Sequence, residues 1–380
     1  MEGYYYEYNV RSWVNTIELF VPFRFEKKLI DESCISKMFE HKAQYVSKGR
    51  YAITHILKSY GISDGLIAIS AYMCPSVRET LIRKGYKITF YDIDLKDFNA
   101  DFNSVSRLIN RESPRAVVVA SMYGNPANLK ELELLCEEKK VLMIDDAAQS
   151  FGAKLDGRYV GSFGGGGFFS FSPGKPTAAH RGGYFWTLKS YDIKRSKHFF
   201  SSFLMYKSFY YNRYLAYEIH PIKSIVWKLI DTVFSRLSLN IENDAIEEYE
   251  KNIVGGVLDV SLNEAKNYRE FWIQEFGKIS ITDHCYMIQP IRGDCSNSCK
   301  LVYVFRDIEA KEKMLDYLQS KCISYYEGYE IPLEADNCSN AKSIEGMVVE
   351  LPIDGDNERM KYLKDCIQSF FQVRDKQHLK

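Results

Sequence analysis

A lysine and an aspartate stand where each could serve an aldehyde cofactor. Asp146 ends one apolar run, and Lys175 follows a second apolar run, 168–171, and the turn residues Pro173 and Gly174. A lysine amine can condense with pyridoxal phosphate as a Schiff base, and a carboxylate can keep the pyridine nitrogen of that cofactor protonated as an electron sink. The pair therefore predicts chemistry based on pyridoxal phosphate.

Both residues also have an ordinary structural interpretation. A loop lysine is more often a solvated charge, and an aspartate after a strand often caps the next helix. The apolar approach to Lys175 favours burial, which lowers the pKa of a lysine as Schiff-base formation requires. An ion pair between Asp146 and a pyridinium at about 4 Å, with an effective dielectric near 20, is worth up to roughly 4 kcal/mol. Asp145 points to the opposite side if this segment is a strand.

A phosphate site is expected at the start of the helix that begins near Tyr51. Gly49 and Arg50 precede this helix, whose first N–H groups can bind a phosphate, and Arg50 can add a charge-assisted hydrogen bond. Ser170, on the strand that leads to Lys175, offers a hydroxyl to the same phosphate. The glycine-rich run 161–167 does not match the nucleotide-binding phosphate loop, because Phe169 and Pro176 stand where that loop needs glycine and Ser or Thr.

Short apolar runs alternate with helical stretches from about residue 49 to residue 187. Strands are expected at 66–69, 87–93, 116–120 and 141–144, and helices at 51–60, 76–84 and 129–139. This alternation predicts βαβ units and a mostly parallel sheet. Tyr72, Tyr123 and Asp146 follow strand ends, where an open α/β sheet has its ligand crevice.

Two domains are expected, a large cofactor-binding domain over residues 1–240 and a small α+β domain over residues 241–380. The small domain has expected strands at 301–305 and 347–352, and expected helices at 308–321 and 358–372. The large domain ends in an aromatic-rich helical segment, 189–239. Its apolar stripe favours packing within the domain or in a dimer, and the alternative is a weak membrane-surface contact through 203–237.

The composition excludes some classes of function. Lys plus Arg and Asp plus Glu both number 50, so no global charge attracts nucleic acid. The nine cysteines are irregularly spaced and lack a C-x-x-C pair, which favours reduced thiols in the cytoplasm and no metal site. Neither a signal peptide nor a membrane-spanning run is expected from the sequence.

Several spaced motifs share one order with a known enzyme family. They are D-A-A-Q-S-F-G-A at 146–153, G-S-F-G at 161–164, F-S-F at 169–171 with Lys175 and Gly182-Gly183, Tyr123-Gly124, D-I-D at 92–94 and Leu351-Pro352. Together they resemble the DegT/DnrJ/StrS family of pyridoxal-phosphate sugar aminotransferases. The resemblance implies the type I fold of these transferases, a mostly parallel central sheet sandwiched by helices, with a smaller C-terminal α+β domain.

The resemblance also implies a role for each matching residue. Lys175 would form the Schiff base and shuttle protons, Asp146 would pair with the pyridine nitrogen, and Gln149 would contact the ring hydroxyl. The phosphate would be held by Gly49, Arg50 and Ser170. Cys74 replaces the aromatic residue that commonly stacks on the ring, and Tyr72 is expected to compensate. Arg181 replaces an acid common before the paired glycines, and the asparagine-arginine motif that reaches the neighbouring subunit is not recognisable at 252–259.

The resemblance implies a homodimer that moves an amino group from glutamate to a nucleotide-linked keto sugar, for surface polysaccharide or antibiotic sugars. A sister group that removes sugar hydroxyls has histidine at the lysine position, so Lys175 favours transamination. Two alternatives stay open. One is a pyridoxal-phosphate enzyme of another reaction type, and the other is a non-catalytic, membrane-docked relative in glycan assembly.

Overall fold

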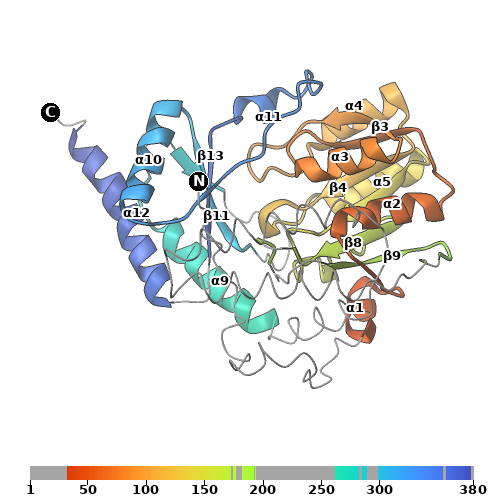
Figure 1. The fold of residues 1–380 in the computed structure, drawn as a ribbon, viewed down its shortest axis with the longest axis horizontal. Helices are drawn as coiled ribbons and strands as arrows, with labels where there is room; N and C mark the ends of the chain where they lie inside the picture. Colours follow the sequence, from red (N-terminus) through yellow and green to blue (C-terminus); the bar gives the residue numbers. More distant parts are fainter. Residues whose placement is uncertain are drawn as a thin grey trace, which may run out of the picture.

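The computed structural model describes residues 32–172, 174–176, 182–191, 193, 262–281, 285–288, 298–353 and 357–377. Figure 1 shows two domains, the larger one coloured red to green and the smaller one teal to blue. The predicted domain boundary at 240, the stretch 203–237 and the segment 252–259 lie outside the described residues. The domain limits and the membrane contact therefore stay predictions.

A seven-stranded sheet forms the centre of the large domain, in the order β1-β9-β8-β5-β4-β2-β3. Its strands are β1 (Gln44–Val46), β2 (Leu66–Ser70), β3 (Lys87–Tyr91), β4 (Ala116–Ala120), β5 (Leu142–Asp146), β8 (Gly166–Ser170) and β9 (Gly183–Thr187). The pairings from β3 through β8 are parallel, whereas β9 runs antiparallel to both of its neighbours. The mostly parallel sheet is confirmed.

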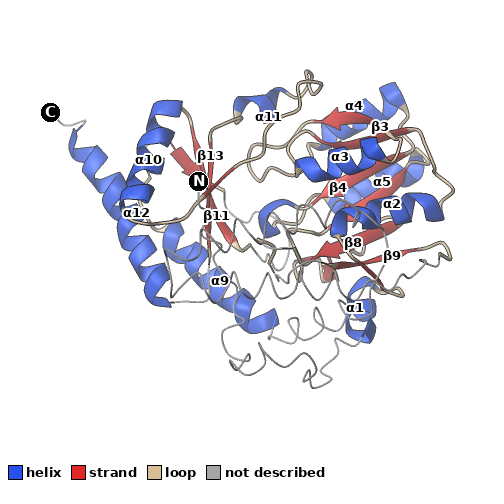
Figure 2. Ribbon diagram, in the orientation of Figure 1, coloured by secondary structure: helices blue, strands red, loops and turns tan. Residues whose placement is uncertain are grey.

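Helices cover both faces of this sheet, as Figure 2 shows. Side chains alternate along β4, so that Val117 and Val119 enter one hydrophobic core and Ala116 and Val118 enter another. The first core is closed by α1 (Glu32–Phe39), α4 (Phe102–Glu112) and α5 (Leu129–Glu138), and the second by α2 (Gly49–Ser59) and α3 (Pro75–Arg83). Burial on both faces explains why β4 is an uninterrupted apolar run.

The small domain has an antiparallel sheet in the order β10-β11-β13-β12. Its elements are α9 (Leu262–Gly277), β10 (Cys285–Met287), β11 (Lys300–Phe305), α10 (Ile308–Ser320), β12 (Tyr326–Glu327), α11 (Ser339–Ser343), β13 (Val348–Pro352) and α12 (Asn357–Gln377). Leu301, Tyr303 and Phe305 pack against α9, α10 and α12. The alternate residues, Val302 and Val304, face the large domain. The expected α/β fold with a smaller α+β domain is confirmed.

Contacts at two places join the domains, one at helix α11 and one in a buried apolar cluster. The carboxylate of Asp92, just after β3, accepts the backbone N–H groups of Asn340 and Ala341, each at 2.9 Å. Tyr72 and Tyr123 share a buried apolar cluster with Val302 and Val304. The small domain therefore packs over the carboxyl edge of the large sheet.

Candidate functional site

The carboxyl ends of the parallel strands bring most of the predicted site residues to one edge of the sheet. Tyr72 follows β2, Tyr123 follows β4, Asp146 ends β5 and Ser170 ends β8. In the register of the sheet, Asp146 lies between Ala120 on one neighbouring strand and Phe168 on the other. This edge is where open α/β sheets bind ligands.

The two neighbouring aspartates have different surroundings, as the alternation along a strand predicts. Asp145 is fully buried, and its Oδ2 accepts the backbone N–H groups of Gly161 at 2.6 Å and Phe163 at 3.1 Å. Asp146 accepts the N–H of Ala148 at 2.9 Å. Burial raises the pKa of Asp146 to about 6, although the Ala148 N–H and the charge of Lys175 both oppose this rise. Asp145 anchors the loop after β7 (Arg158–Tyr159), while Asp146 faces Lys175.

Lys175 lies in a turn at the same edge of the sheet, and the buried region around Lys175, Asp146 and Cys74 is called the chamber below. Gly174 precedes it with a positive φ of 79°, a conformation that glycine adopts without strain. Burial lowers the pKa of Lys175, the Cys74 thiol and the Asp146 carboxylate oppose this effect, and the charge of Lys300 lowers the pKa further. The sequence predicted the direction of this shift. A lysine with a lowered pKa is more often neutral and nucleophilic.

The start of α2 forms a cradle for an anion. No side chain caps this helix, and its first turn carries no acid. A Cβ added at Gly49 would lie 2.7 Å from the Cβ of Ser170 and 2.9 Å from its Oγ, so only glycine lets the two segments approach this closely. Among the described residues, the buried Nε of Arg50 has no hydrogen-bond partner. A bare helix N-terminus, a hydroxyl and a guanidinium with an unsatisfied Nε fit a phosphate group.

Replacing Gly49 with alanine should weaken the binding of pyridoxal phosphate by about 10- to 100-fold, because the new Cβ collides with Ser170 and disturbs charge-assisted hydrogen bonds worth about 1.5–3 kcal/mol. Absorbance titration of the cofactor measures this loss. Pyridoxal, which lacks the phosphate, is the matched ligand and should lose much less affinity. An equal loss for both ligands would mean that the collision distorts the whole site.

Gln149 lies between the two domains at the same edge. Its Oε1 accepts the backbone N–H of Tyr123 at 3.3 Å, and its amide nitrogen donates to the hydroxyl of Tyr329 at 3.0 Å. Tyr329 belongs to the small domain, and burial together with Glu350 raises the pKa of its hydroxyl. Gln149 is thus held by groups from both domains, and its contact with a ring hydroxyl stays a prediction.

Tyr72 is fully buried and lies within the contact between the domains. Its hydroxyl is 2.7 Å from the hydroxyl of Tyr123, and its ring packs against Phe98 and Tyr329. Cys74 precedes α3, and its Sγ lies 3.1 Å from the Oγ of Ser76. Burial raises the pKa of the Tyr72 hydroxyl well above its ordinary value. Tyr72 therefore acts as a neutral hydrogen-bonding group between the two domains.

A buried ion pair in the small domain completes the chamber and was not expected from the sequence. Lys300 pairs with Glu350, and the other oxygen of Glu350 accepts the Tyr123 hydroxyl at 2.6 Å. Burial disfavours the charge of Lys300, but Glu350, Cys299 and Tyr326 together outweigh that effect, so the pKa of Lys300 is raised. The signal was present in the sequence, since a glutamate inside the apolar run of β13 needs a buried partner.

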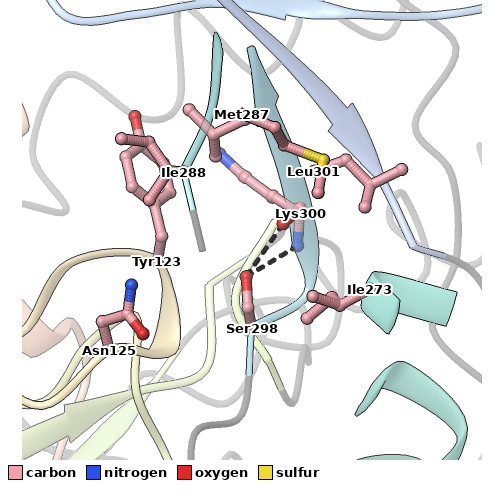
Figure 3. A pocket seen from close by; sticks show the side chains of 9 residues that line it. Tyr123, Asn125, Ile273, Met287, Ile288, Ser298, Lys300 and Leu301 are labelled. Atoms are coloured by element: carbon pink, nitrogen blue, oxygen red, sulfur yellow. Dashed lines mark hydrogen bonds between the residues drawn. The ribbon is translucent and has the colours of Figure 1, made fainter. Parts of the chain in front are cut away.

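A small pocket lies between Tyr123 and the strands of the small domain. Figure 3 shows Tyr123 and Asn125 on one side and Lys300 and Leu301 on the other, with Ser298 below. The Ser298 hydroxyl donates to the Lys300 carbonyl at 2.9 Å. Polar groups of both domains therefore meet beside the chamber that holds Lys175.

The residues present fit pyridoxal phosphate. Asp146 supplies a carboxylate for a ring nitrogen, Lys175 an amine of lowered pKa, and the Gly49 cradle a place for a phosphate. Every cysteine in the described part of the chain is a free thiol. Within the same residues, no group of three or more His, Cys, Asp or Glu could hold a metal ion, and no helix is long and apolar enough to cross a membrane. Arg181 and Cys295 lie outside the described residues.

Comparison with known proteins gives relatives of one family. GDP-perosamine synthase of Escherichia coli O157:H7 is 25% identical over 208 residues, which cover 54% of this chain and 55% of that protein. The match therefore spans about half the length of this curated relative.

The fold is shared with solved structures. A DegT DnrJ EryC1 StrS aminotransferase from Brucella abortus matches with a TM-score of 0.67 and 17% identity, over 90% of this chain and 89% of that chain. A GDP-4-keto-6-deoxymannose-3-dehydratase with a trapped PLP-glutamate geminal diamine matches with a TM-score of 0.61 and 17% identity, over 88% and 90%. The model of the DegT/DnrJ/EryC1/StrS aminotransferase family matches residues 27–218. The chain belongs to this family, as its motifs predicted.

Proposed function

We propose that this protein is a pyridoxal-phosphate-dependent aminotransferase that moves an amino group from glutamate to a nucleotide-linked keto sugar. The observation that carries the proposal is the meeting of Lys175 and Asp146 at the carboxyl edge of the sheet, where each influences the pKa of the other. A lysine of lowered pKa beside a buried carboxylate is the combination that this chemistry requires.

When bound, pyridoxal phosphate supplies an aldehyde that condenses with amines and a ring that accepts electrons. Asp146 holds a proton on the ring nitrogen. Lys175 removes the proton from the α-carbon of glutamate as a general base and later delivers a proton on the way to the sugar amine. Burial of the chamber between the domains keeps water from competing for these protons.

The remaining site residues bind and orient the cofactor. Gly49, Arg50 and Ser170 hold the phosphate, and Gln149 contacts the ring hydroxyl. Cys74 stands on the side of the ring where an aromatic residue is common in the family, and Tyr72 supports that side. The contact between Gly49 and Ser170 and the half-buried position of Cys74 support these roles.

The substrate assignment rests on the family and on the names of relatives. These include GDP-perosamine synthase and a dTDP-3-amino-3,4,6-trideoxy-alpha-D-glucose transaminase of Micromonospora megalomicea, the latter 27% identical over 140 residues. Both names describe amino sugars or their nucleotide-linked forms. We place the protein in surface polysaccharide or antibiotic sugar synthesis, as a cytoplasmic homodimer, and the free thiols agree with a reducing compartment.

An absorbance spectrum with pyridoxal phosphate, recorded before and after glutamate is added, tests this function. We expect a band near the visible edge that glutamate converts to a band at shorter wavelength, because transamination leaves the amine on the cofactor. Addition of a nucleotide-linked keto sugar should restore the first band. A protein that binds the cofactor but keeps its band with glutamate would carry out another reaction, and a colourless protein would favour the non-catalytic alternative.

A further inference from the structure

The turn that carries Lys175 is contacted by the small domain on both sides. The Lys175 N–H donates to the Ser172 carbonyl at 3.3 Å, which closes the turn within the large domain. The carbonyl of Gly174 accepts the Cys299 thiol at 3.9 Å, and the carbonyl of Pro176 accepts the guanidinium of Arg269. The two backbone acceptors that flank Lys175 therefore both bond to residues of the small domain.

Arg269 occupies a position where a charge is costly unless it is hydrogen-bonded. It lies on α9, and only 4% of it is exposed. Trp272, Ile273 and Phe276 follow it at helical spacing, and all three are buried in the core of the small domain. A guanidinium at the end of such an apolar stripe needs acceptors, because an unsatisfied buried charge costs several kcal/mol. Packing alone does not explain an arginine at this position.

The position of the turn matters for the chemistry of Lys175. Its side chain has four rotatable bonds and starts from a short segment after β8, so small backbone shifts move the amine away from a reacting carbon. Misplacement by about 1 Å can cost roughly 100-fold in rate. Lys300, next to Cys299, comes from the same domain and adds a positive charge near Lys175. The small domain therefore both holds the 174–176 turn in place and places a positive charge near Lys175.

We propose that Arg269 is a positioning residue for Lys175, which fixes the 174–176 turn through the Pro176 carbonyl and so makes the reactivity of Lys175 depend on the seating of the small domain. This inference rests on the proposed function of Lys175. It adds a residue that the motifs of the large domain do not contain.

The test is the pH dependence of Lys175 labelling in the cofactor-free protein. An amine-reactive acetylating reagent is applied over a pH series, and the extent of modification of the Lys175 peptide is read by mass spectrometry. In Arg269→Met, the released turn should expose the amine to water, and the midpoint of labelling should rise by about one pH unit or more. With cofactor and glutamate, kcat should fall by about 10- to 100-fold.

Two further variants test whether a change in the labelling midpoint comes from the hydrogen bond between Arg269 and the Pro176 carbonyl. Arg269→Lys keeps a donor that can reach one carbonyl, so its midpoint should lie between those of the wild type and Arg269→Met. Arg158→Met is the matched control, because Arg158 bonds to Glu133 and Ser162 within the large domain. It should lower the melting temperature and leave the Lys175 midpoint unchanged.

Arg269 is only a structural residue if Arg269→Met matches Arg158→Met, with lower stability and an unchanged midpoint. If Arg269→Met does not fold, Arg269→Lys decides, and an unchanged midpoint in that variant overturns the proposal. If the wild type formed no near-visible absorbance band with pyridoxal phosphate, the proposed function would be wrong. The labelling midpoint would still report whether Arg269 holds the turn.

Discussion

A Lys175→Ala protein should lose both the near-visible absorbance of bound pyridoxal phosphate and its aminotransferase activity. The absorbance depends on the bond between cofactor and lysine, and activity depends on the same amine as general base. Loss of a general base alone costs about 100- to 10,000-fold, and the loss of the covalent link adds to this. Absorbance and single-turnover rates with glutamate measure the two effects separately.

The matched control is a second buried lysine that lies outside the chamber. Lys311 is 3% exposed and pairs with Glu327 within the small domain. The double variant Lys311→Met with Glu327→Gln removes a buried lysine together with its carboxylate partner, so that no buried charge is left unpaired, and it should keep the band and the rate. Exogenous methylamine should restore part of the Lys175→Ala rate, since it can enter the cavity left by the side chain. A Lys175→Ala protein that kept its band would refute the role of Lys175.

The sequence was sufficient for the central parallel strands β2, β4, β5 and β8 because these strands are buried on both faces. A strand that is buried on both faces is apolar at every position, so a continuous apolar run such as 116–120 predicts it directly. The strand predicted there matches β4. The predicted ends of the helices and strands differ from the observed ends by a few residues. The predicted helix at 51–60 begins at Gly49 in the structure, and the predicted strand at 87–93 ends at Tyr91. Ile93 instead forms an isolated bridge with Ala100.

Other elements of the large domain were not predicted. The strand β9 is antiparallel and lies between β1 and β8, so its place depends on contacts between distant segments. Helix α4 was not predicted, although Asp101 caps it by accepting the Ser104 N–H at 2.6 Å. An aspartate followed by an amphipathic stretch was the available signal.

Some residues of the candidate site could be predicted from local sequence, and others only from contacts between distant segments. Asp146 and Lys175 follow apolar runs in one domain, so spacing and motif order were enough to identify them. Lys300, Glu350 and Arg269 come from the small domain and reach the site only after the domains meet. No local pattern predicts that Glu350 accepts the Tyr123 hydroxyl. The sequence marks Glu350 as a buried acid, but the partners of all three residues are identified only by long-range contacts.

Replacement of Asp146 with asparagine should lower the turnover of the loaded enzyme by about a thousand-fold. An ion pair at about 4 Å in an effective dielectric near 20 is worth up to roughly 4 kcal/mol, or about three pKa units of the ring nitrogen. A neutral amide cannot hold the proton on that nitrogen, so the ring accepts electrons less well. A loss of that free energy from the transition state corresponds to about three orders of magnitude in kcat.

The pH dependence of ligand binding gives an independent test of Asp146. Pyridoxine phosphate lacks the aldehyde, so its binding does not involve bond formation with Lys175. Because burial raises the pKa of Asp146 to about 6, the carboxyl is mostly protonated below that pH and ionised above it. Affinity should therefore rise between pH 5 and 7, about one unit either side of that value. The Asp146→Asn protein should show a smaller step, because only the ligand phosphate, with a second pKa of about 6, then titrates in this range.

Asp145→Asn is the control that distinguishes an effect on ligand binding from an effect on the stability of the fold. Asp145 is buried beside Asp146, but its carboxylate accepts the N–H groups of Gly161 and Phe163. Loss of one of these bonds should reduce the free energy of unfolding by about 1–3 kcal/mol. The binding step near pH 6 should persist, because Asp146 is intact. If Asp145→Asn reduced the step and Asp146→Asn left it at full size, the assignment of the two carboxylates would be reversed.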